Sequence, residues 1–265
     1  MMKNPWVRLP KRGPFVVGSD KKAVNGFNDR VKESDRLKLD LLPIPFLGNP
    51  SAPVVLLTLN PGYHPSDAKL QSALWFTKAW REALRHKGGG FPFFFLDPNV
   101  EGVAQEPAAR WWERVFSRLA ENPSDEWGAL ARTFFCIEYF PYRSHHYRSM
   151  NIILESQRYG FELARQAVSR GAVVVIMRSR RLWLKEVPEL EGYKHLYVLK
   201  NPRCRTLSPA NLPDGFAKIN RIFVQQTKVI NRFNDTRGFR VGVDAVFERI
   251  PDSEKPYLRT KRRIS

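Results

Sequence analysis

The chain of 265 residues has little cysteine, few acidic residues and no long hydrophobic run. Its two cysteines, Cys136 and Cys204, cannot supply a four-cysteine zinc or iron–sulfur site. No run of apolar residues is long enough for an ordinary membrane-spanning helix, and the N-terminal stretch lacks the apolar part of a secretory signal. These absences predict a protein of the reducing cytoplasm that uses no metal, no other cofactor and no membrane.

Negative charge is also scarce: the chain has 26 Asp and Glu residues but 44 Lys and Arg residues, which gives a formal net charge of +18. Such an excess favours a polyanionic partner, since each phosphate that a cation neutralises releases condensed counterions. A generally basic protein without a nucleic-acid partner would have the same composition. Charge alone therefore favours a nucleic acid without identifying it.

Four short runs rich in aliphatic and aromatic residues predict strands, at Val54–Asn60, Thr133–Tyr139, Ala172–Met177 and Leu196–Lys200. Helical spacing of apolar residues appears in Ser66–His86, Arg110–Ala120, Asn151–Arg170 and about 214–230. Strands that alternate with helices favour parallel pairing and right-handed crossovers. The sequence thus predicts an α/β fold, a three-layer α/β/α sandwich around a four-stranded parallel sheet, with its site at the carboxyl ends of the strands.

We expect one domain over residues 1–265, with a core at about 50–230 and basic N- and C-terminal extensions, and we expect a monomer. The segment Lys87–Pro107 contains three consecutive glycines and an aromatic cluster. It either folds over the site or covers the core. The tail from Lys228, which ends in LRTKRRIS, is either a frayed terminus or an additional phosphate-binding arm.

Two polar motifs follow the first two predicted strands. In Thr58–Ala68 the turn Asn60-Pro61-Gly62 ends the strand and brings a polar side chain to the sheet edge. In Cys136–Arg148, Glu138 lies in an otherwise apolar strand, where a carboxylate needs either a pairing arginine or a chemical role. The residues after it, including Arg143, mix donors with aromatic rings and suit phosphates and exposed bases.

A third motif, Leu199–Leu212, follows the last predicted strand. Asn201 starts the loop, Arg203 and Arg205 add positive charge, Leu207 is apolar among polar neighbours, and Ser208 suits a helix start. A basic loop with an apolar tip could enter a duplex and push a base out of it.

These motifs, in this order, resemble those of the uracil-DNA glycosylase superfamily, and the chain is similar to a divergent member of its Asn-Pro-Gly branch over about residues 54–212. The resemblance implies a monofunctional DNA glycosylase that flips out a pyrimidine base and hydrolyses its bond to the sugar. It implies that Asn60 positions the water, Asn201 faces the departing base, and Tyr63 or Phe76 stacks on that base. It further implies that Leu207 fills the gap in the duplex, and that the strand is held by Arg143, Arg203, Arg205 and Ser208.

Three departures from the family pattern concern the substrate. Gly62 stands where the strict uracil enzymes carry a tyrosine that blocks C5 substituents, Glu138 replaces a base-reading asparagine, and Asn201 replaces a histidine. An ionised Glu138 only accepts hydrogen bonds and suits the amine of cytosine, whereas Tyr139 or Tyr142 facing the base would remove this argument. We therefore expect a C5-substituted cytosine, as in some phage DNA, and a role in antiviral defence. The alternatives are a repair glycosylase for uracil or mismatched thymine, and a catalytically inactive DNA- or RNA-binding protein.

Overall fold

The structure is a computed structural model that describes residues 2–87, 93–97, 106–120 and 123–237. The chain divides into two compact units, Met1–Thr227 and Lys228–Ser265. The first unit contains the sheet and the candidate site. Of the second unit the structure describes residues 228–237, which are helical, so the predicted C-terminal arm lies almost wholly outside the described residues.

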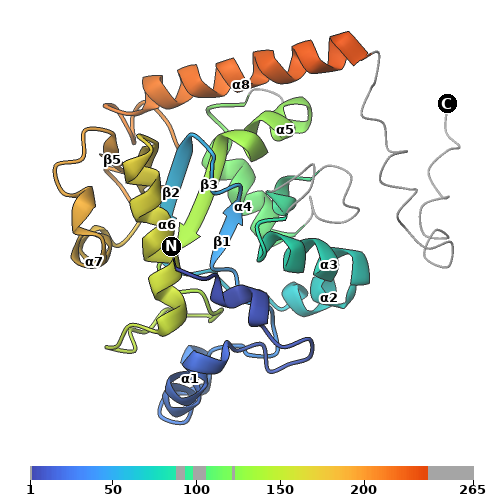
Figure 1. Cartoon of the computed structure of the whole chain (residues 1–265), viewed down its shortest axis with the longest axis vertical. Helices are drawn as coiled ribbons and strands as arrows, with labels where there is room; N and C mark the ends of the chain where they lie inside the picture. The colour runs from blue at the N-terminus through green and yellow to red at the C-terminus, as the bar shows by residue number, and fades with distance from the viewer. Residues whose placement is uncertain (1, 88–92, 98–105, 121–122, 238–265) are drawn as a thin grey trace, which may run out of the picture. The chain divides into compact units, whose positions relative to one another are not determined.

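The first unit is built on a five-stranded sheet with the order β1-β3-β2-β4-β5 (Figure 1). The strands β2 (Val54–Thr58), β3 (Phe134–Glu138), β4 (Val173–Ile176) and β5 (Leu196–Val198) pair in parallel. The edge strand β1 (Phe46–Gly48) runs antiparallel to β3. The predicted α/β class is confirmed, but the sheet is mixed and five-stranded, whereas the sequence led us to expect four strands, all parallel.

The unpredicted strand β1 is only three residues long and lies between Pro45 and Pro50. Proline is tolerated beside an edge strand, because the amide that it lacks would face away from the sheet. Gly48 has φ +98°, and a Cβ there would lie 2.6 Å from the carbonyl oxygen of Phe134. Glycine is therefore required for this strand to approach β3 so closely.

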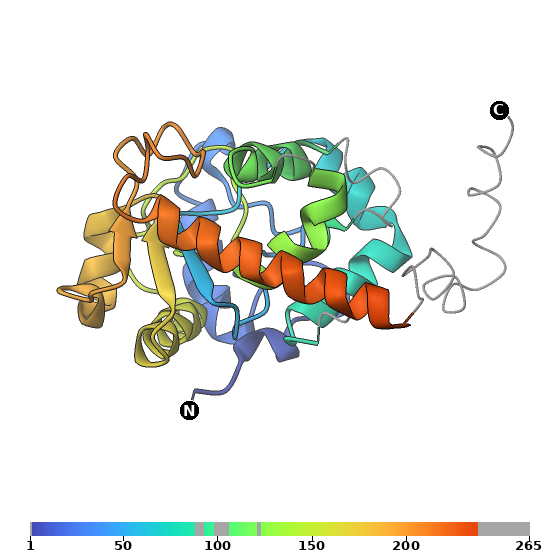
Figure 2. The same cartoon turned by 90° about the horizontal axis from the view of Figure 1, so that it is seen from above.

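Helices cover both faces of the sheet, as the alternating side chains of β3 show. Phe134 packs against Phe116 of α4 (Pro107–Phe116), with ring centroids 4.5 Å apart. Ile137 points to the opposite face, where a Cβ on Gly160 of α6 (Glu155–Ser169) would lie 3.3 Å from it. Since successive residues of a strand face opposite sides, α4 and α6 lie on different faces of the sheet, as Figure 2 also shows.

The remaining helices are α1 (Lys21–Asn28), α2 (Ser66–Ser72), α3 (Leu74–Ala83), α5 (Pro123–Thr133), α7 (Arg180–Glu186) and α8 (Phe216–Arg237). The helix predicted over Ser66–His86 is divided into α2 and α3, because Ala73 is extended with φ −72° and ψ 114°. Three of these helices, α1, α5 and α7, were not predicted from the sequence.

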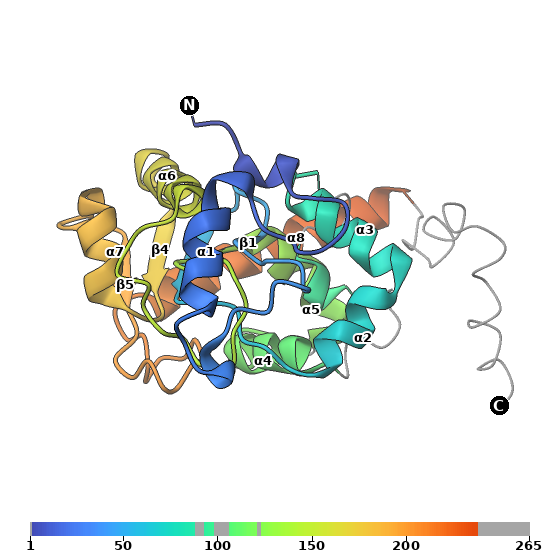
Figure 3. The same ribbon diagram turned by 90° about the horizontal axis from the view of Figure 1, so that it is seen from below.

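The N-terminal segment is part of the compact unit and not an extension of it. Trp6, Val24 and Phe27 are buried. The carboxylate of Asp20, also buried, accepts hydrogen bonds from the Tyr142 hydroxyl (2.8 Å) and the Ser156 amide (3.2 Å). Figure 3 shows this segment and α1 lying across one side of the unit. The unit thus begins well before the predicted core boundary near residue 50.

The predicted loop over Lys87–Pro107 is described only in part. Phe93, Phe94, Phe95 and Leu96 are buried, and the last three form a short 3-10 turn. Most of the other residues of the loop lie outside the described ranges. Within those ranges, no helix has the length and apolar composition that crossing a membrane requires.

Candidate functional site

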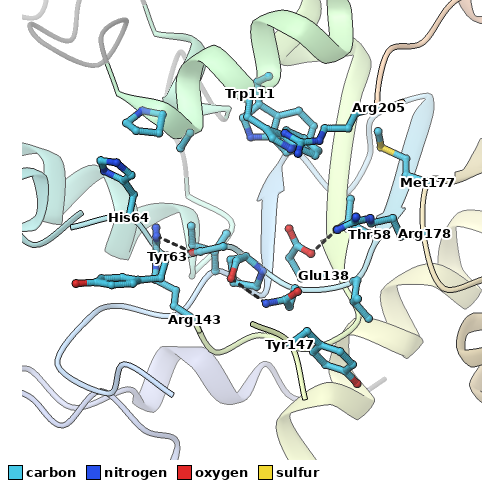
Figure 4. Close-up of a pocket in the computed structure, with 18 of the residues that line it drawn as sticks. Thr58, Tyr63, His64, Trp111, Glu138, Arg143, Tyr147, Met177, Arg178 and Arg205 are labelled. Atoms are coloured by element: carbon cyan, nitrogen blue, oxygen red, sulfur yellow. Dashed lines mark hydrogen bonds between the residues drawn. The ribbon is translucent and has the colours of Figure 1, made fainter. Parts of the chain in front are cut away.

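A cavity of about 890 Å³ opens at the carboxyl ends of the parallel strands (Figure 4). After β2 the chain moves to β3 on one side, and it then crosses to β4 and β5 on the other. The strand order therefore reverses between β2 and β4, which is where open α/β sheets form their ligand crevice. The cavity is lined by the ends of these strands, by α4 and by the segment after β3, through Thr58, Asn60, Trp111, Glu138, Tyr147 and Arg178 among others.

Thr58 and Glu138 form a hydrogen-bonded pair at this end of the sheet. They are partners in the parallel register of β2 and β3, so their side chains lie on the same face, the one that α4 covers. The Thr58 hydroxyl oxygen lies 2.5 Å from Oε2 of Glu138 and 3.0 Å from the carbonyl oxygen of Ile137. Figure 4 shows Glu138 inside the cavity, between Trp111 and Tyr147.

Burial raises the pKa of Glu138 to about 8, although the hydrogen bond from Thr58 and the charges of Arg143 and Arg178 oppose this effect. At pH 7 the carboxyl group is therefore mainly protonated. A protonated Glu138 can donate through Oε2 to Thr58, whose own hydroxyl hydrogen then goes to the carbonyl of Ile137. This arrangement satisfies all three groups and leaves Oε1 as a hydrogen-bond acceptor.

The sequence left open whether Glu138 or a neighbouring tyrosine faces the site. Tyr139 is buried and packs against Phe161 and Trp183, with ring centroids 5.3 and 5.5 Å away. Tyr142 is also buried, and its hydroxyl donates a hydrogen bond to Asp20. Burial, and next the charge of the Asp20 carboxylate, raise the pKa of Tyr142. Of the three candidates, Glu138 is the one that lines the cavity.

The predicted loop after β2 borders the cavity with Asn60, Gly62 and Tyr63. The amide nitrogen of Asn60 donates to the carbonyl of Pro61 at 3.2 Å, which leaves its side-chain oxygen for another partner. Tyr63 is packed edge-on against His145, with ring centroids 4.5 Å apart. A Cβ on Gly62 would meet no atom within 4 Å, so the loop leaves open space at this point.

Arg143, which the sequence predicted to bind DNA, lines the cavity but is buried in an ion pair. It is 3% exposed, and Nη1 donates to the carboxylate of Asp67 (2.6 Å) and to the carbonyl of Gly62 (3.2 Å). Its guanidinium group lies 4.9 Å from the ring of Trp80, and Asp67 also accepts from the amide of His64. Arg143 therefore fixes the loop between Asn60 and Asp67 from beneath.

Two further predictions are wrong because the side chains are buried in the core. Phe76 is fully buried among Trp80, Phe94 and Phe95 and does not line the cavity, so it cannot stack on a bound base. Leu207, the expected wedge, is also fully buried, and its amide donates to the carbonyl of Val115.

In the loop after β5, two of the residues expected to act on DNA instead form hydrogen bonds with backbone amides of the same loop. Oδ1 of Asn201 accepts from the amides of Arg203 (2.9 Å) and Cys204 (3.4 Å), and Asn201 does not line the cavity. The Ser208 hydroxyl accepts from the amide of Asn211 at 3.3 Å. Arg203 is exposed outside the cavity, whereas Arg205 lines it.

The cavity also contains residues outside the three predicted motifs, notably Trp111, Arg114 and Arg178. Arg178 is the second residue after β4, so the strand-end rule could have identified it. Trp111 lies on a helix whose apolar stripe gives no indication of which aromatic ring reaches the cavity. Among the described residues, no three His, Cys, Asp or Glu side chains are grouped to hold a metal ion.

Comparison of the chain with protein-family models, with curated proteins and with solved structures finds no match. The resemblance to the uracil-DNA glycosylase superfamily therefore stays a prediction, which depends on the motifs and on the site that they form.

Proposed function

We propose that the chain is a monofunctional DNA glycosylase of the uracil-DNA glycosylase type, with the three-layer α/β/α arrangement of that superfamily. One observation carries the proposal: Asn60 and Glu138, from separate sequence motifs, line one cavity at the carboxyl ends of adjacent parallel strands. DNA is the proposed partner, and the protein acts as a monomer without a cofactor.

In the proposed reaction the target nucleotide leaves the base stack and its base enters the cavity. Asn60 orients a water molecule toward the sugar carbon C1′, the bond to the base breaks, and the base departs with the bonding electrons. The water oxygen bonds to C1′, and a water proton passes to the base or to solvent. Asn60 is a poor base, so the rate depends mainly on stabilising the departing base.

No lysine is among the described residues that line the cavity. A lysine amine would be needed to form a Schiff base with the sugar and to cut the strand. The expected product is therefore an abasic site in an intact strand.

The hydrogen-bonding pattern of Glu138 supports cytosine as the base. With its proton directed to Thr58, the carboxyl group presents Oε1 as an acceptor, and the exocyclic amine of cytosine is the matching donor. The protonated carboxyl group thus accepts from the amine of cytosine as an ionised Glu138 would. The open space at Gly62 and the 890 Å³ volume support a large C5 substituent, as in some phage DNA, and hence a role in antiviral defence.

The test uses end-labelled oligonucleotides that contain, at one position, uracil, mismatched thymine, hypoxanthine, cytosine or a 5-hydroxymethylcytosine carrying a sugar. We expect alkali-labile sites at the sugar-bearing cytosine, and about 100-fold fewer with Asn60→Ala. Alkali-labile sites only at uracil or mismatched thymine would contradict the cytosine assignment and favour a repair glycosylase.

A second candidate function is a DNA-binding protein that has lost catalysis. It is favoured by Asn201, whose side-chain oxygen is bound by its own loop and which does not line the cavity, so the expected stabiliser of the departing base is missing. This candidate predicts DNA binding without an abasic product from any of the oligonucleotides. It also predicts that Asn60→Ala leaves binding unchanged.

A further inference from the structure

The apolar wedge that the sequence predicted, Leu207, is not available at the cavity. Leu207 is fully buried. None of the large apolar side chains that are exposed within the described ranges lines the cavity; these are Met2, Val7, Leu74, Ile152, Val198, Val224 and Val229. Proteins that kink a duplex at a base step commonly insert an apolar side chain to replace the lost stacking. The exposed apolar residues that do line the cavity are the prolines Pro107 and Pro202, so the long aliphatic wedge expected for opening paired DNA is missing from the described residues.

The same cavity carries a cluster of arginines, of which Arg178 is close enough to Glu138 for its charge to lower the pKa of that carboxyl group. Arg114 comes from α4, Arg178 from the end of β4 and Arg205 from the loop after β5, and all three line the cavity. None of them is in an ion pair between described side chains. Burial lowers the pKa of Arg205, and the charges of Arg178 and Arg114 lower it further. Like charges held together in this way are stabilised when an anion binds between them.

An aromatic ring stands beside these cations. The guanidinium carbon of Arg205 lies 5.7 Å from the ring centroid of Trp111, and Trp112 packs edge-on against Trp111 at 4.4 Å. Figure 4 shows Arg205 and Trp111 together on one side of the cavity, and Arg178 below them next to Thr58. Indole rings and guanidinium planes both stack on unpaired bases.

We propose that this site binds single-stranded DNA, with bases stacked on Trp111 and Arg205 and phosphodiesters bound by Arg114, Arg178 and Arg205. A single strand presents bases that are already unpaired, so it needs no wedge to deliver a nucleotide to the cavity. The inference rests on the proposed function for its choice of DNA. The preference for single-stranded over double-stranded DNA is inferred from the arginine cluster and from the burial of Leu207.

The experiment measures binding by fluorescence anisotropy, with the full chain and a labelled 20-mer of unmodified DNA as a single strand or as a duplex. We expect the single strand to bind at least about 10-fold more tightly at the same salt concentration. Arg205→Gln should weaken this binding several-fold and reduce the slope of log affinity against log salt by about 0.7, the value for one phosphate contact on a single strand. Arg181→Gln, on an exposed arginine of α7 that does not line the cavity, is the matched control and should change both less.

Equal or tighter binding of the duplex would overturn the inference, as would tighter binding of the RNA strand of the same sequence. Competition by a deoxynucleoside triphosphate at the oligonucleotide concentration would overturn it as well, because the site would then hold a mononucleotide. Binding does not require base removal, so the two proposals can fail separately. Single-strand preference without any abasic product supports this inference and contradicts the glycosylase, whereas an abasic product with duplex preference does the reverse.

Discussion

The pKa of Glu138 makes a quantitative prediction about stability. The change is Glu138→Gln, which keeps the shape of the protonated side chain and cannot ionise. A pKa of about 8 in the folded chain, against an ordinary value of 4.5, means that the folded state holds its proton more tightly than the unfolded state does. Each pH unit between these values then costs the folded state about 1.4 kcal/mol.

The sign follows from the direction of the shift. Below pH 4.5 Glu138 is protonated in both states and costs nothing. Between pH 4.5 and about 8 the carboxyl group of Glu138 ionises in the unfolded state but stays protonated in the folded state. The free energy of unfolding therefore falls as the pH rises through this range, and it falls no further above about pH 8. The full difference corresponds to about 5 kcal/mol, and contact of the side chain with water in the cavity reduces the expected value to about 2–5 kcal/mol.

The assay is urea unfolding of the wild type and of Glu138→Gln at pH 5 to 9. We expect Glu138→Gln to be more stable than the wild type at pH 8. The difference between their free energies of unfolding should shrink toward pH 5. Glu191→Gln, on an exposed glutamate, is the control and should track the wild type. A constant gap between wild type and Glu138→Gln across this range would refute the reasoning.

Three further predictions follow from other contacts. Asp67→Asn leaves the buried Arg143 without its counter-charge and should lower the free energy of unfolding by about 3–5 kcal/mol in urea titrations; a loss below about 1 kcal/mol would contradict the structural role of the pair. Gly48→Ala places a Cβ against β3 at a positive φ and should cost about 1–3 kcal/mol, visible as a lower Tm, while an unchanged Tm would show that β1 is placed wrongly. Trp111→Ala should weaken binding of a single-stranded 20-mer about 5- to 150-fold, the equivalent of about 1–3 kcal/mol for one stacked base, and unchanged affinity would remove Trp111 from the site.

The four parallel strands could be predicted because each is a short apolar run between helical segments. The strand β1 could not, since three residues between prolines carry no periodicity and its pairing depends on the close approach at Gly48. The break between α2 and α3 was missed for a similar reason, because one extended residue, Ala73, leaves the apolar spacing nearly unchanged.

The candidate site was predictable where strand ends determine it. Asn60 and Glu138 both follow from the rule that sites lie at the carboxyl ends of parallel strands. Arg143 was misread because its partner Asp67 lies 76 residues away in the chain, and only the fold brings the two together. Leu207 was misread because an apolar residue in a polar loop looks the same in sequence whether it points outward or, as here, into the core.

The most direct test of base excision is mass spectrometry of the small molecules released from defined DNA. Single-stranded DNA containing 5-hydroxymethylcytosine that carries a sugar would be incubated with the wild-type chain and with Asn60→Ala. The proposed function predicts that the wild type releases the free modified base and leaves a matching number of abasic sites. With Asn60→Ala the amount of released base should be about 100-fold lower. Release of no base from this DNA, or from DNA with uracil or mismatched thymine, while the chain still binds it, would contradict the glycosylase proposal.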